Sequence, residues 1–340
     1  MSREQELIAA IKEADVKSVE KLIKEGANLK FKDDEQSYSL TWPLLHHCIF
    51  KASSYPKEEY TTIATLLLEN GHGIEAVNSS GETPAMFAIK YFAPDIFDLL
   101  IQKGAKIKAV NKQKHNLFDI VLERYQYDQQ LDMEHIDEEE NKAKKATIKK
   151  GEGESLTVMF RRIDALVKNG YDLQKGKYSA AHCIIFDIEQ KKLPAKALYY
   201  LFDKGADPKE YFESVDGDLC PLFDYACNKK LPVELLEEMA KRIGLNYIFE
   251  DFDELNTFTI AINNNNLPLV KRLVQLGADI HAQDEIALLS ACDMGYQKIV
   301  EYLVEQGAHV NIVDPNGYTP IAYAEQSGFT KIVEYLKSKM

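Results

Sequence analysis

Apolar side chains recur along the chain in short blocks that have the period of an α-helix, and each block ends at a glycine. In the block before Gly307 they fall at positions i, i+1, i+4 and i+5, so they share one helical face, with lysine and glutamate between them. The same pattern precedes Gly104, Gly170 and Gly277. Because glycine adopts the left-handed backbone conformation at no steric cost, it commonly ends a helix. The pattern predicts a series of short amphipathic helices.

These glycines also define a period. A small residue follows most of them, and the copies of the signal are Gly26, Gly71, Gly104, Gly170, Gly205, Gly244, Gly277 and Gly307. Most separations between successive copies are about 33 residues. The longest separation, from Gly104 to Gly170, is twice that length. Such a period is typical of a protein built from stacked repeats.

A second helix is predicted upstream of each of these blocks. Its clearest copy, residues 314–324, reads Asp-Pro-Asn-Gly-Tyr-Thr-Pro-Ile-Ala-Tyr-Ala. Asn316 and Gly317 favour a tight turn. Thr319 can cap the helix, and Pro320 suits its first position, where no N–H is needed. A similar segment starts at Gly81.

Together these features resemble the ankyrin repeat, in which Asp-x-x-Gly-x-Thr-Pro-Leu-His-x-Ala leads into one helix and Gly-Ala-Asp follows a second. The resemblance extends from about Glu6 to Met340 and is strongest over residues 78–106 and 251–340. It implies an all-α fold, an ankyrin-repeat solenoid of about eight stacked helix pairs with short hairpin-like fingers. It also implies that the chain binds other proteins on the concave face formed by the fingers and inner helices.

The repeat pattern predicts N-terminal capping helices in residues 1–28 and a repeat array in residues 29–340. The approximate units of the array are 29–73, 74–106, 107–172, 173–207, 208–246, 247–279, 280–309 and, as the C-terminal cap, 310–340. Within the third unit, residues 126–155 are interpreted as a charged insertion between two helices. The alternative is a decayed extra repeat, but the stretch holds too few apolar side chains to bury the face of a helix pair.

Charge and composition narrow the class of partner. The chain has 340 residues and a net charge of −13, which disfavours nucleic acid and anionic membranes and favours a protein with a basic or neutral surface. No apolar stretch is long enough to span a bilayer, and the N-terminus lacks the apolar core of a signal peptide. The five cysteines are scattered and odd in number. A cytoplasmic protein is expected, with a monomer favoured.

The candidate chemistry is sparse. His182 occupies the family's histidine position, and His46 or His47 fills it in another unit. His47-Cys48 and His182-Cys183 could suggest a nucleophile pair, but neighbouring residues on a helix point about 100° apart. No metal-binding or phosphate-binding motif occurs. The sequence therefore predicts no enzyme, with no catalytic, metal-binding or cofactor-binding residues.

The candidate binding surface is a pair of acidic fingers with aromatic residues. Its predicted members are Tyr211, Phe212, Asp216, Asp218, Glu250, Asp251, Phe252, Asp253 and Glu254, with Trp42 as a separate candidate anchor. The alternative for the phenylalanines and for Trp42 is packing inside the fold. If Phe252 belongs to the core, the contact surface is expected instead near Trp42, Glu82, Lys112 and Tyr178.

The predicted function is a non-catalytic protein–protein interaction scaffold or inhibitor. Three alternatives remain open at this point: a bacterial effector, a toxin-neutralising protein of the immunity type, and an accessory subunit of an enzyme. The only segment outside the repeats has about 30 residues, which is too short for an enzyme domain.

Deleting residues 132–153 and closing the loop should leave the melting temperature nearly unchanged, because few apolar groups are lost. Circular dichroism melting of the full and shortened chains measures this. A large fall in melting temperature would instead favour the extra repeat.

Overall fold

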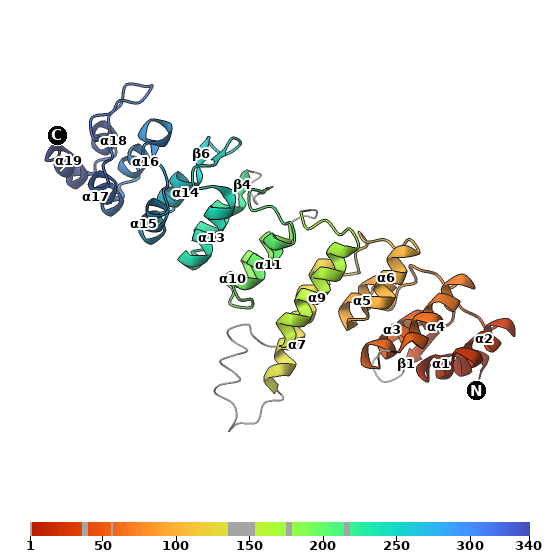
Figure 1. Cartoon of the computed structure of the whole chain (residues 1–340). Helices are drawn as coiled ribbons and strands as arrows, with labels where there is room; N and C mark the ends of the chain where they lie inside the picture. Colours follow the sequence, from red (N-terminus) through yellow and green to blue (C-terminus); the bar gives the residue numbers. More distant parts are fainter. Residues whose placement is uncertain (1, 36–39, 56, 135–153, 175–178, 214–217) are drawn as a thin grey trace. The chain divides into compact units, whose positions relative to one another are not determined.

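The computed structural model describes every residue except 1, 36–39, 56, 135–153, 175–178 and 214–217. The described part is mainly helical, with three two-stranded antiparallel hairpins (Figure 1), so the predicted all-α repeat fold is confirmed. It forms two compact units, Met1–Asp172 and Leu173–Met340. The centre of the predicted insertion lies outside the described residues.

Unit 1 consists of two rows of helices. The inner row contains α1 (Arg3–Lys12), α3 (Leu44–Ser54), α5 (Pro84–Tyr91) and α7 (Leu117–Glu134), each packed against the next. The outer row contains α2 (Val16–Lys24), α4 (Glu58–Glu69), α6 (Pro94–Gln102) and α9 (Glu154–Lys168). The strands β1 (Lys32–Glu35) and β2 (Leu40–Pro43) form a hairpin in which Asp33 lies opposite Trp42.

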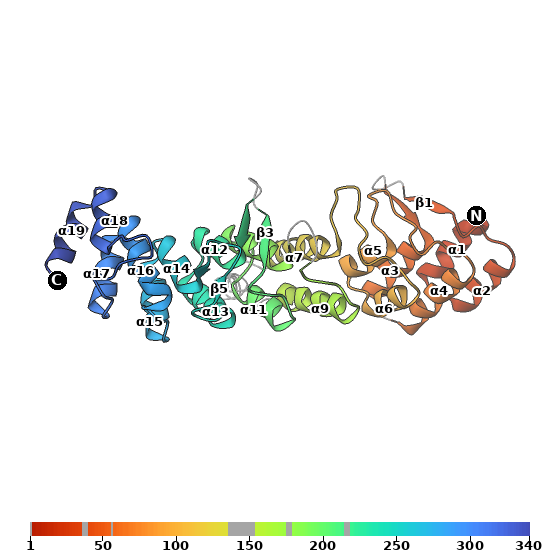
Figure 2. The same cartoon turned by 90° about the horizontal axis from the view of Figure 1, so that it is seen from above.

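Unit 2 repeats this arrangement. After the pair α10 (Ala180–Glu189) and α11 (Lys196–Asp203), an inner row follows with α12 (Leu222–Asn228), α14 (Thr257–Asn263), α16 (Ala282–Asp293) and α18 (Pro320–Gln326). The outer row contains α13 (Val233–Ile243), α15 (Leu267–Gln275), α17 (Gln297–Glu305) and α19 (Thr330–Lys337). Two hairpins lead into inner helices: β3 (Tyr211–Glu213) with β4 (Leu219–Pro221), and β5 (Ile248–Phe249) with β6 (Leu255–Asn256). Figure 2 shows β3 extending away from the helical layers.

Local sequence signals set the ends of the helices as predicted. The Thr319 hydroxyl accepts a hydrogen bond from the Ala322 amide at 3.1 Å, and Pro320 occupies the first turn. At the other end, Gly104 and Gly307 have φ values of 91° and 103°, which an L side chain rarely adopts. The chain can therefore turn sharply after each outer helix.

Small residues let the inner helices approach one another. Ala88, Ala261, Ala291 and Ala324 are all buried at the contacts within the inner rows. A larger side chain at such a position would overpack the interface between two repeats. Among the residues that the structure describes, no helix combines the length and the apolar character needed to cross a bilayer.

His46 fills the histidine position of its repeat and ties α3 to the next finger. Its Nε2 lies 3.0 Å from the Glu82 carbonyl oxygen, and the side chain is fully buried. Its Nδ1 has no hydrogen-bond partner among the described residues. Burial therefore lowers the pKa of His46 to about 3, because a second N–H would have no acceptor.

The stability of unit 1 should fall as the pH drops from 6.5 toward 4. The pKa of His46 is lower in the folded state than in the unfolded state, so its contribution is complete above pH 6.5 and is lost on acidification. The loss is at most about 1.4 kcal/mol per pH unit. His46→Gln keeps an N–H donor but does not titrate, so its melting temperature should fall less with acid than that of the wild type. Equal acid dependence of the two proteins would contradict this role for His46.

Candidate protein-binding groove

A groove of about 1050 Å³ opens on the inner row of unit 1. Its lining comes from α1, α3, α5, α7 and the end of β2. Four cations line it, and they are Lys12, Lys51, Lys90 and Arg124. Four aromatic rings line it as well, and they are Trp42, Phe50, Tyr91 and Tyr127. Glu123 is the one acidic residue of the lining, so the lining carries more cations than carboxylates in a chain whose net charge is −13.

The aromatic side chains of the groove are packed against one another. The Trp42 ring lies 5.3 Å from Phe50 and 5.2 Å from the buried Phe87, measured between ring centroids. Phe50 meets Tyr91 at 5.3 Å with nearly perpendicular planes. These contacts hold Trp42 in place while it still borders the groove, so its predicted packing and its predicted role as an anchor are compatible.

The cations are held in different ways. The Arg124 guanidinium stacks over Tyr127 at 4.6 Å and over Tyr91 at 5.4 Å, and its Nε lies 2.7 Å from an Asp128 carboxylate oxygen. Lys51 lies 6.0 Å from the Tyr55 ring and has no carboxylate within ion-pair distance among the described residues. The Lys51 ammonium is thus the groove charge most available to a ligand.

Arg162 of the outer helix α9 contacts the inner helices α5 and α7, which contribute to the groove lining. Its side chain is 3% exposed, and its Nη1 donates to the Asp128 carboxylate at 2.8 Å. Its Nε donates to the Ile89 carbonyl at 3.1 Å, and its Nη2 donates to the Lys90 carbonyl at 3.3 Å. One guanidinium therefore links the last turn of α5 to the carboxylate that holds Arg124.

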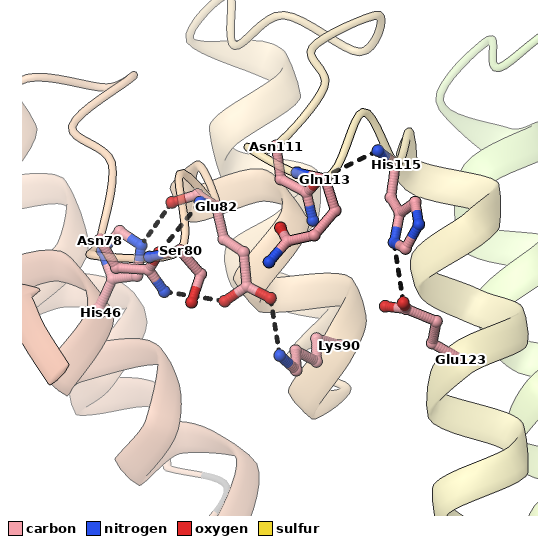
Figure 3. A network of polar contacts seen from close by, with 9 residues as sticks. All are labelled: His46, Asn78, Ser80, Glu82, Lys90, Asn111, Gln113, His115 and Glu123. Atoms are coloured by element: carbon pink, nitrogen blue, oxygen red, sulfur yellow. Dashed lines mark hydrogen bonds and ion pairs between the residues drawn. The ribbon is translucent and has the colours of Figure 1, made fainter. Parts of the chain in front are cut away.

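The finger turns next to the groove repeat the same hydrogen bonds 33 residues apart. The Asn78 side-chain oxygen accepts from the amides of Ser80 and Glu82, and the Asn111 oxygen accepts from the amides of Gln113 and His115, as Figure 3 shows. Each turn then reaches the inner helix that follows it. Both turns are therefore fixed by the same side-chain hydrogen bonds, and each contacts one residue of the groove lining.

The polarity of these two finger-to-helix contacts is reversed. In the first, the buried Glu82 carboxylate pairs with Lys90 at 2.6 Å, while in the second, His115 Nδ1 lies 2.8 Å from Glu123 (Figure 3). In the first pair the cation belongs to the groove, and in the second the carboxylate does. In the second pair the groove residue is therefore an acid, Glu123, although the other charged residues of the lining are basic.

Each histidine–cysteine pair has one member whose environment disfavours covalent catalysis. The Cys48 thiol donates to the Tyr60 carbonyl at 3.1 Å, and burial raises its pKa, so the reactive thiolate is disfavoured. His182 stacks on Tyr225 at 4.5 Å, and burial lowers its pKa to about 4. The Cys48 thiol and the His182 imidazole are therefore better suited to packing than to covalent or proton-transfer chemistry at neutral pH.

The predicted acidic fingers lie in unit 2. Glu250, Asp251, Asp253 and Glu254 are exposed in the turn between β5 and β6, and Asp218 is exposed before β4. Asp216 lies outside the described residues. The Tyr211 hydroxyl is within hydrogen-bonding reach of the Asp251 backbone, so the β3 finger and this turn are neighbours.

The aromatic residues of these fingers are less available than the carboxylates. Phe212 is half-buried, with its ring 4.3 Å from His182 and 5.0 Å from Tyr225. Phe252 and Tyr211 are half-buried too, and Phe249 is fully buried. The carboxylates thus face solvent, while the aromatic rings partly serve the packing of the fold.

The groove cations were not among the residues singled out from the sequence. A lysine or arginine recurs near the end of each of the first three predicted inner helices and within the fourth. This recurrence is the sequence signal that could have indicated them. Trp42 is the one predicted binding residue that borders the groove.

Comparison with known proteins identifies the repeats. The family model described as ankyrin repeats (3 copies) matches residues 7–111 and 258–340. An ankyrin repeat protein of Acanthamoeba polyphaga mimivirus is 29% identical over 193 residues, which cover 52% of this chain and 48% of the relative. A second ankyrin repeat protein of that virus is 27% identical over 208 residues, 52% of this chain and 27% of the relative.

A regulatory subunit of protein phosphatase 1 from Mus musculus is also similar, with 38% identity over 80 residues, 23% of this chain and 51% of the relative. The match spans about half the length of that subunit and of one viral relative, and about a quarter of the other. The family model covers more than half of the chain, and the helix pairs, capped turns and terminal glycines agree with it. This chain belongs to the ankyrin repeat family.

Proposed function

We propose that this chain is a non-catalytic binding protein whose ligand is another protein, and that the groove of unit 1 holds an acidic segment of that partner. The observation that carries the proposal is the groove lining itself, in which four cations and four aromatic rings gather in one concavity of an acidic chain. A carboxylate in the groove would meet Lys51 and Arg124. An apolar side chain next to it would rest on Trp42 and Phe50.

The arrangement favours binding because little of it needs to be ordered when the ligand arrives. Arg124 is already stacked on two rings and paired with Asp128, and Trp42 is already packed on the rings of His47, Phe50 and Phe87. Preorganised side chains lose less conformational freedom on binding, so more of the contact energy contributes to affinity. The family's role in protein–protein interaction supports the proposal, as does similarity to a protein named as a phosphatase regulatory subunit.

Selection of a random peptide library on the full chain tests the groove. Acidic peptides that also carry a tryptophan, tyrosine or leucine should be enriched. Lys51→Glu should weaken their binding roughly tenfold, since an attraction becomes a repulsion. Trp42→Ala should cost about 2 kcal/mol or more if the ring is an anchor.

Lys103→Glu is the matched control, because Lys103 is an exposed outer-row cation that pairs with Glu69 at 3.1 Å. It should leave the affinity unchanged. Equal affinities of the wild type and Lys51→Glu, at low and at physiological salt, would contradict the groove as the binding site. Trp42→Ala also removes packing, so its effect counts only if its melting temperature shows a folded unit 1.

A second surface is proposed on the fingers of unit 2, for a basic segment of a partner. The observation that favours it is the turn between β5 and β6, where Glu250, Asp251, Asp253 and Glu254 are all exposed. Asp218 belongs to the neighbouring finger and adds to the negative potential. Long-range charge of this kind mainly speeds association, whereas Phe252 and Tyr211 would slow release.

Replacing those four carboxylates of the β5–β6 turn by Asn or Gln should lower the association rate of lysine-rich peptides from the same selection and flatten its salt dependence. Stopped-flow association at several salt concentrations measures both. Replacing Glu234, Glu305, Glu325 and Glu334, which are exposed on helices of the same unit, removes the same number of charges and is the control for net charge. If both variants behave alike, the fingers have no specific role. If Phe252→Ala lowers the melting temperature and leaves binding intact, Phe252 belongs to the core.

A further inference from the structure

Two histidines and a glutamate from consecutive repeats of unit 2 converge on one point. His281 lies between the Gly277 turn and the main part of α16, Glu285 lies four residues later, and His309 follows the Gly307 turn. The His281 Nδ1 lies 2.5 Å and the His309 Nδ1 2.6 Å from the same oxygen, Glu285 Oε1. One ligand-type atom from each side chain lies within 4.8 Å of the others.

The Glu285 carboxylate is buried, and its two oxygens differ in the number of hydrogen-bond partners that they have. Its side chain is 4% exposed, while those of His281 and His309 are 45% and 70% exposed. Besides the two imidazoles, Oε1 accepts the His309 amide at 3.1 Å. Oε2 is buried and has no hydrogen-bond partner among the described residues. A buried carboxylate oxygen without a donor is costly, so this end of the group is poised for another ligand.

The backbone around Glu285 holds this geometry. Gln283, Asp284 and Glu285 have φ values of 52°, 54° and 65°, so the segment before α16 proper is a left-handed turn. The Gln283 side chain donates to the Glu254 carbonyl at 2.7 Å and accepts from Asn256 at 2.8 Å. The turn that presents Glu285 is therefore anchored to the neighbouring finger.

We propose that His281, Glu285 and His309 form a binding site for a divalent transition-metal ion of the zinc class. Two imidazole nitrogens and one carboxylate are a ligand set that such ions favour, whereas Mg²⁺ and Ca²⁺ favour oxygen ligands. To bind the metal through Nδ1, each neutral imidazole would carry its proton on Nε2, so that the Nδ1 lone pair is free for the ion. Bidentate binding would also give Oε2 a partner. Because His309 is largely exposed, at least one coordination position faces solvent and can accept water or a side chain of a partner protein.

No short sequence motif indicates this site, and for that reason the sequence predicted no metal-binding residues. His281 and Glu285 belong to one finger region, and His309 follows the next outer helix, 24 residues after Glu285. Only the stacking of two repeats brings the third ligand to the other two. The competing interpretation is a metal-free hydrogen-bonded link between the repeats. Titration with a metal ion distinguishes these two interpretations.

Isothermal titration of the chelator-treated full chain with Zn²⁺ tests the proposal. One ion should bind per chain and raise the melting temperature. His309→Ala and His281→Ala should each weaken binding at least about tenfold. His309 is exposed enough that its loss should leave the fold intact, and circular dichroism checks this. Millimolar Mg²⁺ should not displace Zn²⁺.

His115→Ala is the matched control, because His115 pairs with one carboxylate, Glu123, and belongs to no metal-type cluster among the described residues. It should leave Zn²⁺ binding unchanged. Co²⁺ serves as a spectroscopic probe: it should give weak visible bands without the strong near-ultraviolet band of a cobalt–thiolate bond. Absence of binding, equal binding by His309→Ala and the wild type, or a thiolate band from Cys183 or Cys220 would each overturn the proposal.

Discussion

The apolar face of one helix pair in this chain is covered only when the next pair stacks against it. Most of its helices have between 7 and 12 residues, and helices of that length are marginal in isolation. Their stability must come from contacts with the neighbouring repeat. Ala88 and Ala291 are buried in the inner rows, where a small side chain lets two helices approach closely. The three proposed binding sites follow from this stacking, because each is built from residues of successive repeats.

Features of the fold that depend on local backbone chemistry could be predicted from the sequence. The positive φ of Gly104 and Gly307 and the cap formed by Thr319 are decided within a few residues, so short motifs reveal them. The groove of unit 1 is different. Lys12, Lys51 and Lys90 are 39 residues apart in turn, which differs from the period of about 33 that the glycines define. Their meeting depends on the register between stacked helices.

The direction of an aromatic side chain in a finger is equally hard to predict, because it depends on what the neighbouring repeat offers. Phe212 finds His182 and Tyr225 beside it and packs there. Phe249 finds Tyr211 and Tyr247 at 5.8 and 5.0 Å and is fully buried. The carboxylates of the same fingers were simpler to place, since an unpaired charge stays in water unless a partner covers the cost of burial.

The buried guanidinium of Arg162 shows how the outer layer influences a surface that it does not form. A charge with 3% exposure is tolerated only if its hydrogen bonds are satisfied, and Arg162 satisfies them with Asp128 and with two carbonyls at the end of α5. Both carbonyls lie in the last turn of α5, where carbonyls lack the usual i+4 amide partner, so the same contact stabilises the helix end. Asp128 is thereby fixed, and it in turn fixes Arg124 against Tyr91 and Tyr127. The position of a cation at the groove therefore depends on α9. If the groove binds a partner as proposed, substitutions in the outer row of unit 1 should alter that binding without contacting the partner.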